Sequence, residues 1–528
     1  MIRGIATTIL IFVSLQHVSA TTYFVSTTGK DSNNGKALDQ SWATLQKAAD
    51  VMLAGDTCFV ADGAYSQDIK INRSGSESGD LTFKSINKWG AKITSENYIF
   101  NIGESAEGVG YITIDGFELT ATGTYGVGVH SKDGAHHITV RNCWVHDCGE
   151  SGISLQDGDY RVIENNVCNN NSALMKYCGS GISVFGSAMF DEKPGFHTII
   201  RNNICFRNMN DPQLTLNTDG NGIIVDDLRN TQTGNHFAGK NINYTGNETL
   251  VENNLCYENG GAGIQLYVSN NITVRNNTCY NNQLRRSKET WRGNISASCC
   301  ANVLFVNNIS VVSTNLRADG GSSDWSYFSS NSAFGAFGLT GDSYAKNYTF
   351  FNNIAYNLDE PKSDAITAQG IVIALKGVNN NKIATDPLLV NAGKLITSDF
   401  RLKPGSPAID AGTSEFRNAE TDLDNKSRII NGTIDIGAYE YDKSVSAIRL
   451  TSPELDRLNY SYTGNSLRIN NLSCAKCTAS VFSLEGKLMT KKILSLENEI
   501  KVSLRKGAVY IVSVDGNETN IKSKLYIN

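Results

Sequence analysis

An asparagine pair that follows a short β-branched run returns throughout the middle of this 528-residue chain. A full copy is Ile163–Cys168, which reads IENNVC, and a shorter copy with a single asparagine occurs at Asn142. The first asparagines stand at 142, 165, 202, 253, 276, 307 and 352, in steps of 23, 37, 51, 23, 31 and 45 residues. The two 23-residue steps fit one minimal coil of a solenoid, and the longer steps fit the same coil carrying an insertion.

Each repeat is too short for a βαβ unit with its helix, and its short strands are separated by Asn and Gly. Coils stacked at about 4.8 Å would place equivalent residues directly above one another. Asn suits the turns because it tolerates left-handed backbone angles, and stacked amides can bond along a column. The predicted fold class is therefore all-β, a right-handed parallel β-helix.

A second motif precedes the asparagine pair in several coils. Its copies alternate Ile and Val or Leu on one face, which predicts one parallel sheet with these residues inside. The copies are Gly152–Leu155, Gly181–Val184, Gly222–Val225 and Gly263–Leu266.

Both ends of the chain carry recognisable segments. Residues 1–20 combine Arg3, an apolar run and Val18-Ser19-Ala20, as in a secretory signal peptide, and no later apolar run is long enough to span a membrane. We therefore expect a monomer that is secreted or bound at the cell surface. The net charge of −5 argues against nucleic acid as a partner.

Residues 23–65 predict a strand followed by a capping helix. Ser41 is the expected N-cap, and Leu45, Ala48, Ala49 and Met52 share one helical face, which would cover the exposed first coil. This stretch resembles the N-terminal end of secreted right-handed β-helix proteins, many of which are polysaccharide lyases.

Two further resemblances concern the C-terminal part. Phe400–Gly412 and Asp435–Glu440, with Asp386-Pro387-Leu388 upstream, resemble the terminal segment of secreted bacterial β-helix proteins, expected at the far end of the solenoid. Val481–Lys487 and Lys506–Val514 resemble the β-sandwich sorting domain of type IX secretion, a system of Bacteroidota. A carbohydrate-binding sandwich is the alternative. The predicted domains are a signal peptide at 1–20, a β-helix at 21–441 and a small β-sandwich at 442–528.

Twelve cysteines in an exported chain invite disulfides, but the spacing of four of them favours another arrangement. Each falls two residues after the second asparagine of a pair, so they should stack as a reduced interior column and pack as small hydrophobic side chains. These residues are Cys168, Cys205, Cys256 and Cys279. Cys474 and Cys477 lack two further ligands for a zinc site.

The longer repeats locate the candidate site. Loops of neighbouring coils would extend over one sheet and make it a groove, and functional residues concentrate on such loops. The insertions are Ser187–Phe196, Asn208–Thr218, Leu228–Thr249 and Leu284–Gly293.

One bank of the groove is predicted to be acidic and the other basic. Asp219, Asp226 and Asp227 are candidate Ca²⁺ ligands, unless Asp219 marks a turn and the other two merely end a strand. The basic loop can neutralise uronate carboxylates and stack a ring on a sugar, although a solvated charged loop is the plain alternative. It holds Arg285, Arg286, Lys288, Trp291 and Arg292.

Two glycan-cleaving chemistries compete for this groove. Asn217-Thr218-Asp219 and Asp226-Asp227 are similar to polygalacturonase motifs, but here they lie on one strand, and Gly-His-Gly and Arg-Ile-Lys are missing from the chain. The overall pattern resembles the pectate lyases of polysaccharide lyase family nine. In that family the calcium aspartates fall on adjacent coils, whereas the next coil here, Gly260–Ile264, has no acid.

The resemblance implies a calcium-assisted β-elimination on an acidic, uronate-containing polysaccharide such as pectate. A Lys or Arg base removes the proton next to the uronate carboxylate, and a cationic environment lowers its pKa. Lys288 or Arg292 is the predicted base, and Lys240 is held in reserve. Arg285, Arg286 and Trp291 would bind substrate. Two alternatives stay open, a non-catalytic glycan-binding or surface protein on the same scaffold and a uronan epimerase.

Overall fold

The computed structural model describes most of the chain from residue 20 onward. The described residues are 20–175, 178–211, 219–232, 235–240, 248–284, 293–313, 328–331, 346–359, 361–362, 378–393, 398–416, 419–430, 432–442, 459–463, 466–470, 477–483, 488–494, 499–504, 509–515 and 520–526.

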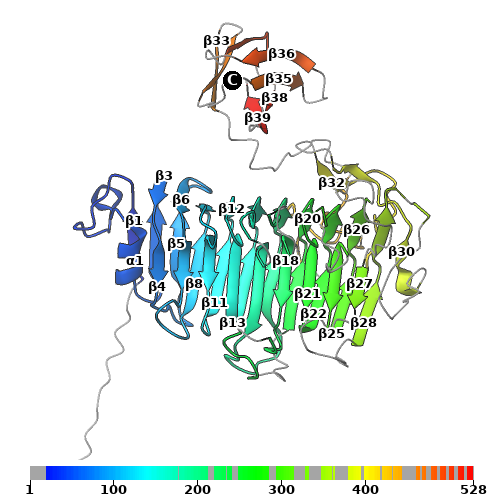
Figure 1. The fold of residues 1–528 in the computed structure, drawn as a ribbon, viewed down its shortest axis with the longest axis horizontal. Coiled ribbons are helices and arrows are strands. Elements are labelled where there is room, and N and C mark those ends of the chain that lie inside the picture. Colours follow the sequence, from blue (N-terminus) through cyan, green and yellow to red (C-terminus); the bar gives the residue numbers. More distant parts are fainter. Residues whose placement is uncertain are drawn as a thin grey trace, which may run out of the picture.

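Successive coils place one strand in each of three parallel sheets, called A, B and C (Figure 1). Sheet C holds β4 (Ile69–Ile71), β7 (Tyr98–Ile102), β10 (Val127–Ser131), the first half of β13 (Ile153–Glu164), β15 (Ser180–Ser187), β18 (Asn221–Asp226), β21 (Ile264–Tyr267), β24 (Ile295–Ser298) and β27 (Phe328–Asn331). The chain then enters sheet A, which holds β1 (Thr22–Val25), β2 (Thr57–Val60), β5 (Leu81–Ser85), β8 (Gly110–Asp115), β11 (His136–Arg141), the second half of β13, β16 (Phe196–Arg201), β19 (Glu248–Glu252), β22 (Asn270–Arg275), β25 (Ala301–Val306) and β28 (Lys346–Phe351). Sheet B completes the coil with β3 (Gly63–Ser66), β6 (Ala91–Ser95), β9 (Glu118–Ala121), β12 (Trp144–His146), β14 (Val167–Asn169), β17 (Ile204–Phe206), β20 (Leu255–Tyr257), β23 (Thr278–Tyr280), β26 (Ile309–Val312), β29 (Ile354–Asn357) and β30 (Lys382–Ile383). The predicted parallel β-helix is confirmed.

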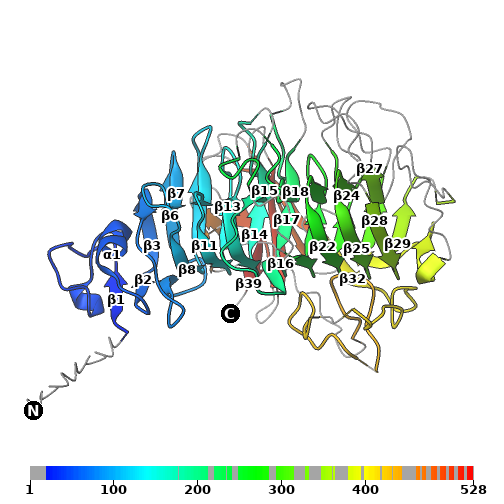
Figure 2. The same ribbon diagram turned by 90° about the horizontal axis from the view of Figure 1, so that it is seen from below.

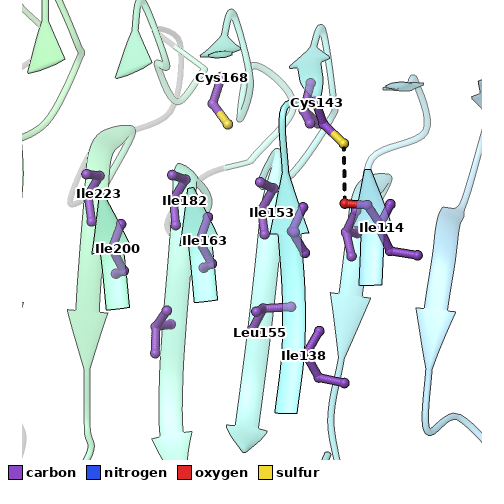
Figure 3. Close-up of a cluster of buried hydrophobic side chains, with 14 of the residues drawn as sticks. Ile114, Ile138, Cys143, Ile153, Leu155, Ile163, Cys168, Ile182, Ile200 and Ile223 are labelled. Atoms are coloured by element: carbon purple, nitrogen blue, oxygen red, sulfur yellow. Dashed lines mark hydrogen bonds between the residues drawn. The ribbon is translucent and has the colours of Figure 1, made fainter. Parts of the chain in front are cut away.

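Identical residue types stack along the interior because the strands of neighbouring coils pair in register. In sheet C, Ile153 pairs with Ile182 and Ile182 with Ile223, while Ile163 pairs with Ile200 in sheet A. All five are fully buried, and Figure 3 shows them repeating from coil to coil. The Gly-Ile motifs therefore form one sheet, as the sequence predicts.

The two asparagines of each pair have different roles at the corner between sheets A and B. The first adopts the left-handed conformation, with φ of 58° at Asn165 and 56° at Asn202. The second points inward: Asn203 Nδ2 donates to Ile163 O (2.9 Å) and to Asn254 Oδ1 (3.0 Å). These amides form a continuous ladder of residues 166, 203, 254, 277, 308, 353 and 381.

A second amide ladder, absent from the sequence prediction, fills the corner between sheets B and C. Asn208 Nδ2 donates to Asn259 Oδ1 (2.9 Å) and to Cys168 O (3.1 Å). The repeat carried the signal, because Asn recurs five residues after the second asparagine in four coils. The ladder runs through Asn171, Asn208, Asn259, Asn282 and Asn294.

The predicted cysteine column lies on sheet B. Cys168, Cys205, Cys256 and Cys279 pair with one another in register, and all four are fully buried and free. Burial raises the pKa of the Cys168 thiol well above its usual value, so it stays protonated and packs as a small hydrophobic group.

On the outer face of sheet A, the residues before the asparagine pair alternate in charge from coil to coil. Ion pairs join Arg201 to Glu164 (2.7 Å) and Arg275 to Glu252 (2.7 Å). Opposite charges on directly paired residues stabilise a sheet, whereas like charges would destabilise it. The column consists of Asp115, Arg141, Glu164, Arg201, Glu252 and Arg275.

The N-terminal coil is covered by α1 (Leu45–Val51), which follows the short helix η1 (Leu38–Gln40) (Figures 1 and 2). Leu45 and Met52 are fully buried, as the predicted apolar face requires. The N-cap is Thr44, whose hydroxyl accepts from Lys47 N, and not Ser41. Ser41 is instead buried three residues earlier, bonded to Ser26 Oγ (2.7 Å).

Residues 386–441 pack on the outer face of sheet B, which differs from the expected place at the far end of the solenoid. This segment, gold in Figures 1 and 2, contains the antiparallel strands β31 (Leu389–Asn391) and β32 (Asp399–Leu402) and follows η2 (Val378–Asn380). The Phe400 ring packs against the rings of Tyr257 and Tyr280, with centroids 4.8 Å and 5.4 Å apart. The apolar outer face of sheet B is therefore covered at β20 and β23.

Polar contacts fix the same segment to the corner asparagines. Arg428 Nη2 donates to Asn253 Oδ1, and Asn253 Nδ2 donates to Thr421 O (2.8 Å). Arg428 also forms a fully buried ion pair with Glu440 (2.7 Å). Glu440 thus has a structural role.

Two antiparallel sheets follow, of β33 (Asn459–Thr463), β34 (Ser466–Asn470) and β37 (Glu499–Lys501), and of β35 (Cys477–Ser483), β36 (Leu488–Leu494), β38 (Val509–Asp515) and β39 (Asn520–Tyr526). Leu467 of the first sheet and Val481 of the second are fully buried. The predicted signal peptide lies outside the described residues, except for residue 20. Within the described part of the chain, no helix has the length and apolarity that a membrane crossing requires.

Candidate functional site

The four predicted insertions all adjoin sheet C. Two of them follow β15 and β18 on the side of sheet A, and two precede β18 and β24 on the side of sheet B. At the second margin, Gln283 N donates to Gly261 O (2.7 Å) and Leu284 N to Asn259 O (3.0 Å), which anchors the start of the basic loop. The described ends of the acidic and basic loops thus flank one sheet from opposite sides, as expected.

Asp227 holds in place the start of the insertion Leu228–Thr249, called here the acidic loop. It follows β18 with a left-handed φ of 48° and is fully buried. Its carboxylate accepts from Thr231 N (2.8 Å), Thr231 Oγ1 (3.0 Å), Gln232 N (2.9 Å) and Asn235 Nδ2 (2.9 Å). Four hydrogen bonds from its own loop give this predicted metal ligand a structural role in the present arrangement.

Asp226 is the last residue of β18 and lies at the margin of sheet C. Its half-buried carboxyl group accepts one hydrogen bond, from Gln232 Nε2 (2.6 Å). Burial, followed by the negative charges of Asp219 and Asp227, raises the pKa of Asp226 well above its usual value. A carboxyl group with a raised pKa beside a groove is a candidate for proton donation or for binding an ionic ligand.

Asp219 lies two residues before the start of β18, at the opposite margin. It accepts from Cys178 N (2.7 Å) and Asn221 Nδ2 (3.2 Å). β18 therefore separates Asp219 from Asp226 and Asp227, and no group of three acids, histidines or cysteines in the described residues could hold a metal ion. The described donors do not fit the calcium site expected from the sequence.

The predicted catalytic and substrate-binding residues of the basic loop lie outside the described residues. These are Arg285, Arg286, Lys288, Trp291 and Arg292. Lys240 is described and exposed, with its ammonium group 5.9 Å from the ring centre of Phe237. It belongs to the acidic loop, so its backbone lies on the same side of sheet C as Asp226.

The outer face of sheet C carries two polar groups that the sequence reasoning did not single out. Gln265 of β21 and Ser296 of β24 pair in register and are almost fully buried. Gln265 Oε1 and Ser296 Oγ have no hydrogen-bond partner in the described structure. Buried polar atoms without partners are rare, and a ligand with hydroxyl or amide groups would satisfy them. The sequence signal for Gln265 was a Gln at a strand position that Ser or Ile occupies in the neighbouring coils.

Tyr267 extends this surface to the acidic margin, because it pairs in register with Asp226. Burial raises the pKa of its phenol, so the hydroxyl stays protonated at neutral pH. The Arg229 side chain, which follows β18, links to the coil of β24, because its Nη1 donates to Cys299 O (3.0 Å). Asp226, Gln265 and Tyr267 together give the outer face of sheet C groups that donate and accept hydrogen bonds.

No protein-family model matches the chain, and no curated protein sequence matches it.

Several solved structures have similar folds. The pectate lyase Pel9A is 14% identical, with a TM-score of 0.47, over 81% of this chain and 98% of that chain. An alginate lyase from Paenibacillus sp. str. FPU-7 is 17% identical, with a TM-score of 0.33, over 64% and 92%. The A-module of the mannuronan C-5 epimerase AlgE6 of Azotobacter vinelandii is 18% identical, with a TM-score of 0.36, over 57% and 78%. At these identities the likeness concerns the fold alone.

Proposed function

We propose that sheet C binds an acidic polysaccharide and cleaves it by β-elimination. The observation that carries the proposal is the cluster at the ends of β18 and β21. There a carboxyl group with a raised pKa, Asp226, adjoins a protonated phenol, Tyr267, and the orphaned amide oxygen of Gln265 lies two residues before Tyr267 on the same strand.

β-Elimination removes the proton next to a uronate carboxylate, and that proton becomes acidic only when the carboxylate charge is reduced. A protonated Asp226 donates a hydrogen bond to the uronate carboxylate, and the amide of Gln265 adds a second polar contact. The base is Lys288 or Arg292 of the basic loop, which starts at the opposite margin, and Lys240, on the same side as Asp226, is held in reserve. Arg285, Arg286 and Trp291 bind the flanking sugars.

Two finer parts of the proposal rest on the sequence. Calcium stays a prediction, and no step above depends on it. Export through the signal peptide, and type IX sorting through residues 442–528, place the activity outside the cell or at its surface.

The test measures the ultraviolet absorbance of unsaturated uronate products from polygalacturonate, alginate and glycosaminoglycans, with and without chelator. Asp226→Ala should lower turnover by about 10²–10³-fold, the usual cost of losing one preorganised hydrogen-bond donor to a developing charge. Glu164→Gln, on sheet A, is the matched acidic control and should keep activity. Absence of unsaturated product from every polyuronate would contradict the proposal, as would full activity of Asp226→Ala. Exchange of the C5 proton for deuterium without cleavage would indicate an epimerase instead.

The raised pKa of Asp226 also predicts how pH acts. Activity should fall as pH rises through that pKa, because the protonated form is the working one. Between the ordinary carboxyl pKa and the raised one, the folded state keeps a proton that the unfolded chain has released. The free energy of unfolding therefore falls as pH rises from the ordinary pKa to the raised pKa. Asp226→Asn removes this penalty and should raise the unfolding temperature at neutral pH. A lower unfolding temperature of Asp226→Ala would mean that its lost activity reports damaged folding.

A further inference from the structure

One outward position recurs at the start of the sheet A strands, next to the turn from sheet C. Strand register places aromatic residues there in the first four coils of the column and amides in the last three. The column runs Tyr111, His137, Tyr160, His197, Glu248, Asn271, Asn302 and Asn347.

The first half of the column is a stack of rings. Centroids are 4.3 Å apart for Tyr111 and His137, 4.3 Å for His137 and Tyr160, and 3.9 Å for Tyr160 and His197. Phe190, from the loop after β15, lies edge-on to His137 (4.9 Å) and Tyr160 (6.0 Å). The stack therefore has a second aromatic wall beside it.

The backbone at this position does not favour aromatic residues. φ is 58° at Tyr111, 51° at His137 and 47° at Tyr160. Asn271 and Asn302 occupy the same position with φ of 58° and 56°. Asn adopts this left-handed conformation readily, whereas bulky side chains do so at a cost. Such strain is kept mainly where surrounding structure and function require it.

The rings border a hollow of about 560 Å³ on the outer face of sheet A. This volume lies in the range of small-molecule sites. Glu77, Asp80, Phe190, Lys193 and Phe196 line the hollow beside the rings. The Phe190 side chain is 44% exposed, which leaves an apolar surface open to a ligand.

Charges in the hollow disfavour an anionic ligand. Asp191 is engaged by Tyr160 Oη (2.7 Å) and by Lys193 (3.1 Å), so the ammonium group is neutralised. Glu77 and Asp80 remain as acidic groups of the lining. Carboxylates and amides beside exposed aromatic rings are suited to a sugar, because they accept from hydroxyl groups while the rings cover its apolar face.

We propose that this hollow is a carbohydrate-binding site for an uncharged glycan, separate from the acidic-polysaccharide site on sheet C. Phe190 and Phe196 pack on the apolar face of a sugar, and Glu77 and Asp80 accept from its hydroxyls. No described residue bonds His137 Nε2, which is therefore available to a further hydroxyl.

The amide half of the column extends the site. Asn302 Nδ2 donates to Asn271 Oδ1 (2.9 Å), and Asn347 Nδ2 to Asn302 Oδ1 (2.9 Å). These side chains border a second hollow of about 520 Å³ with Thr273 and Thr349. A linear chain along the column reaches both hollows, so affinity should increase with chain length.

The test titrates the full chain calorimetrically with neutral oligosaccharides of the xylan, glucan, mannan and galactan types. Oligogalacturonates are the charged comparison. His137→Asn and Tyr160→Asn install the residue that the same position carries in later coils, so the fold should persist. Both should weaken binding of the neutral ligand at least tenfold. Asp226→Ala is the matched control, which should lose cleavage of polyuronate and keep this binding.

Each outcome separates the two sites. Neutral binding that is lost in the Asn variants, with polyuronate cleavage unchanged, supports a second site. The proposal is overturned if no neutral oligosaccharide binds, if binding persists in both Asn variants, or if oligogalacturonates bind there more tightly than neutral chains. Circular dichroism of both variants checks that the β-helix has formed.

Discussion

Asparagine serves this chain in chemically distinct ways at neighbouring positions. Asn253 takes a left-handed φ of 56° and bonds outward to the segment that covers sheet B, whereas Asn254 is fully buried. Asn254 Oδ1 accepts from Asn203 N (2.9 Å) and Nδ2 (3.0 Å), and its own Nδ2 donates to Ile200 O (2.9 Å). The pair therefore turns the chain and joins adjacent coils in two consecutive residues.

Asn254→Ala should lower the free energy of unfolding by roughly 1–3 kcal/mol, because the bonded groups of Asn203, Ile200 and Asn277 stay buried without partners. Chemical denaturation measures the loss. Asn302→Asp, in the exposed amide column of sheet A, removes one solvent-accessible bond and should change stability by less than about 0.5 kcal/mol. Equal effects of the two substitutions would contradict a ladder that acts through burial.

The alternating charges lie near the ends of the sheet A strands, just before the asparagine pairs. Burial decides how much each ion pair contributes to the free energy of unfolding. The side chains of Glu252 and Arg275 are 2% and 6% exposed, whereas that of Arg201, the partner of Glu164, is 41% exposed. A buried charge that loses its partner is costly, while an exposed pair contributes little.

Glu252→Ala should therefore destabilise the protein by about 3–5 kcal/mol, because it removes the carboxylate that neutralises the buried Arg275 guanidinium. Glu164→Ala, in the same column, should cost at most about 1 kcal/mol. Thermal unfolding of both variants provides the comparison. A larger loss from Glu164→Ala would mean that the order of charges, and not burial, controls the ladder.

The whole molecule combines a β-helix with two antiparallel sheets that have buried residues of their own. Residues 386–441 cover sheet B at β20 and β23, and the sites proposed for ligands lie on the outer faces of sheets A and C. The site proposed on sheet C and the hollow on sheet A are thus carried by different faces of one rigid scaffold, consistent with loops that determine function and coils that position them.

Deletion of residues 442–528 should abolish export in a host with type IX secretion. The same deletion should spare the specific activity of protein made without export, because no residue of the proposed site lies in that region. Cell fractionation and the lyase assay measure the two effects. Loss of activity in a folded truncated protein would favour the substrate-binding sandwich.

The candidate site was predictable only in outline. Insertions in a regular repeat identify the decorated sheet without any coordinates, and Asp226 was found in this way. Gln265 was overlooked because a polar residue on an outward strand position is usually solvated, and only the structure shows that its amide oxygen is buried. The sequence assigned Asp227 to a metal because it does not show the hydrogen bonds from Thr231, Gln232 and Asn235. Those bonds depend on how the loop closes.

The repeat by itself determined the β-helix, the inward residues, the cysteine column and the sheet that carries the loops, because stacking in register converts sequence period directly into spatial contact. Tertiary structure alone decided that residues 386–441 fold back on sheet B, that Asp219 is separated from Asp226, and that Tyr111, His137, Tyr160 and His197 form one stack. Those outcomes depend on loop paths and on insertions of unequal length, which shift sequence spacing without shifting the register of the coils.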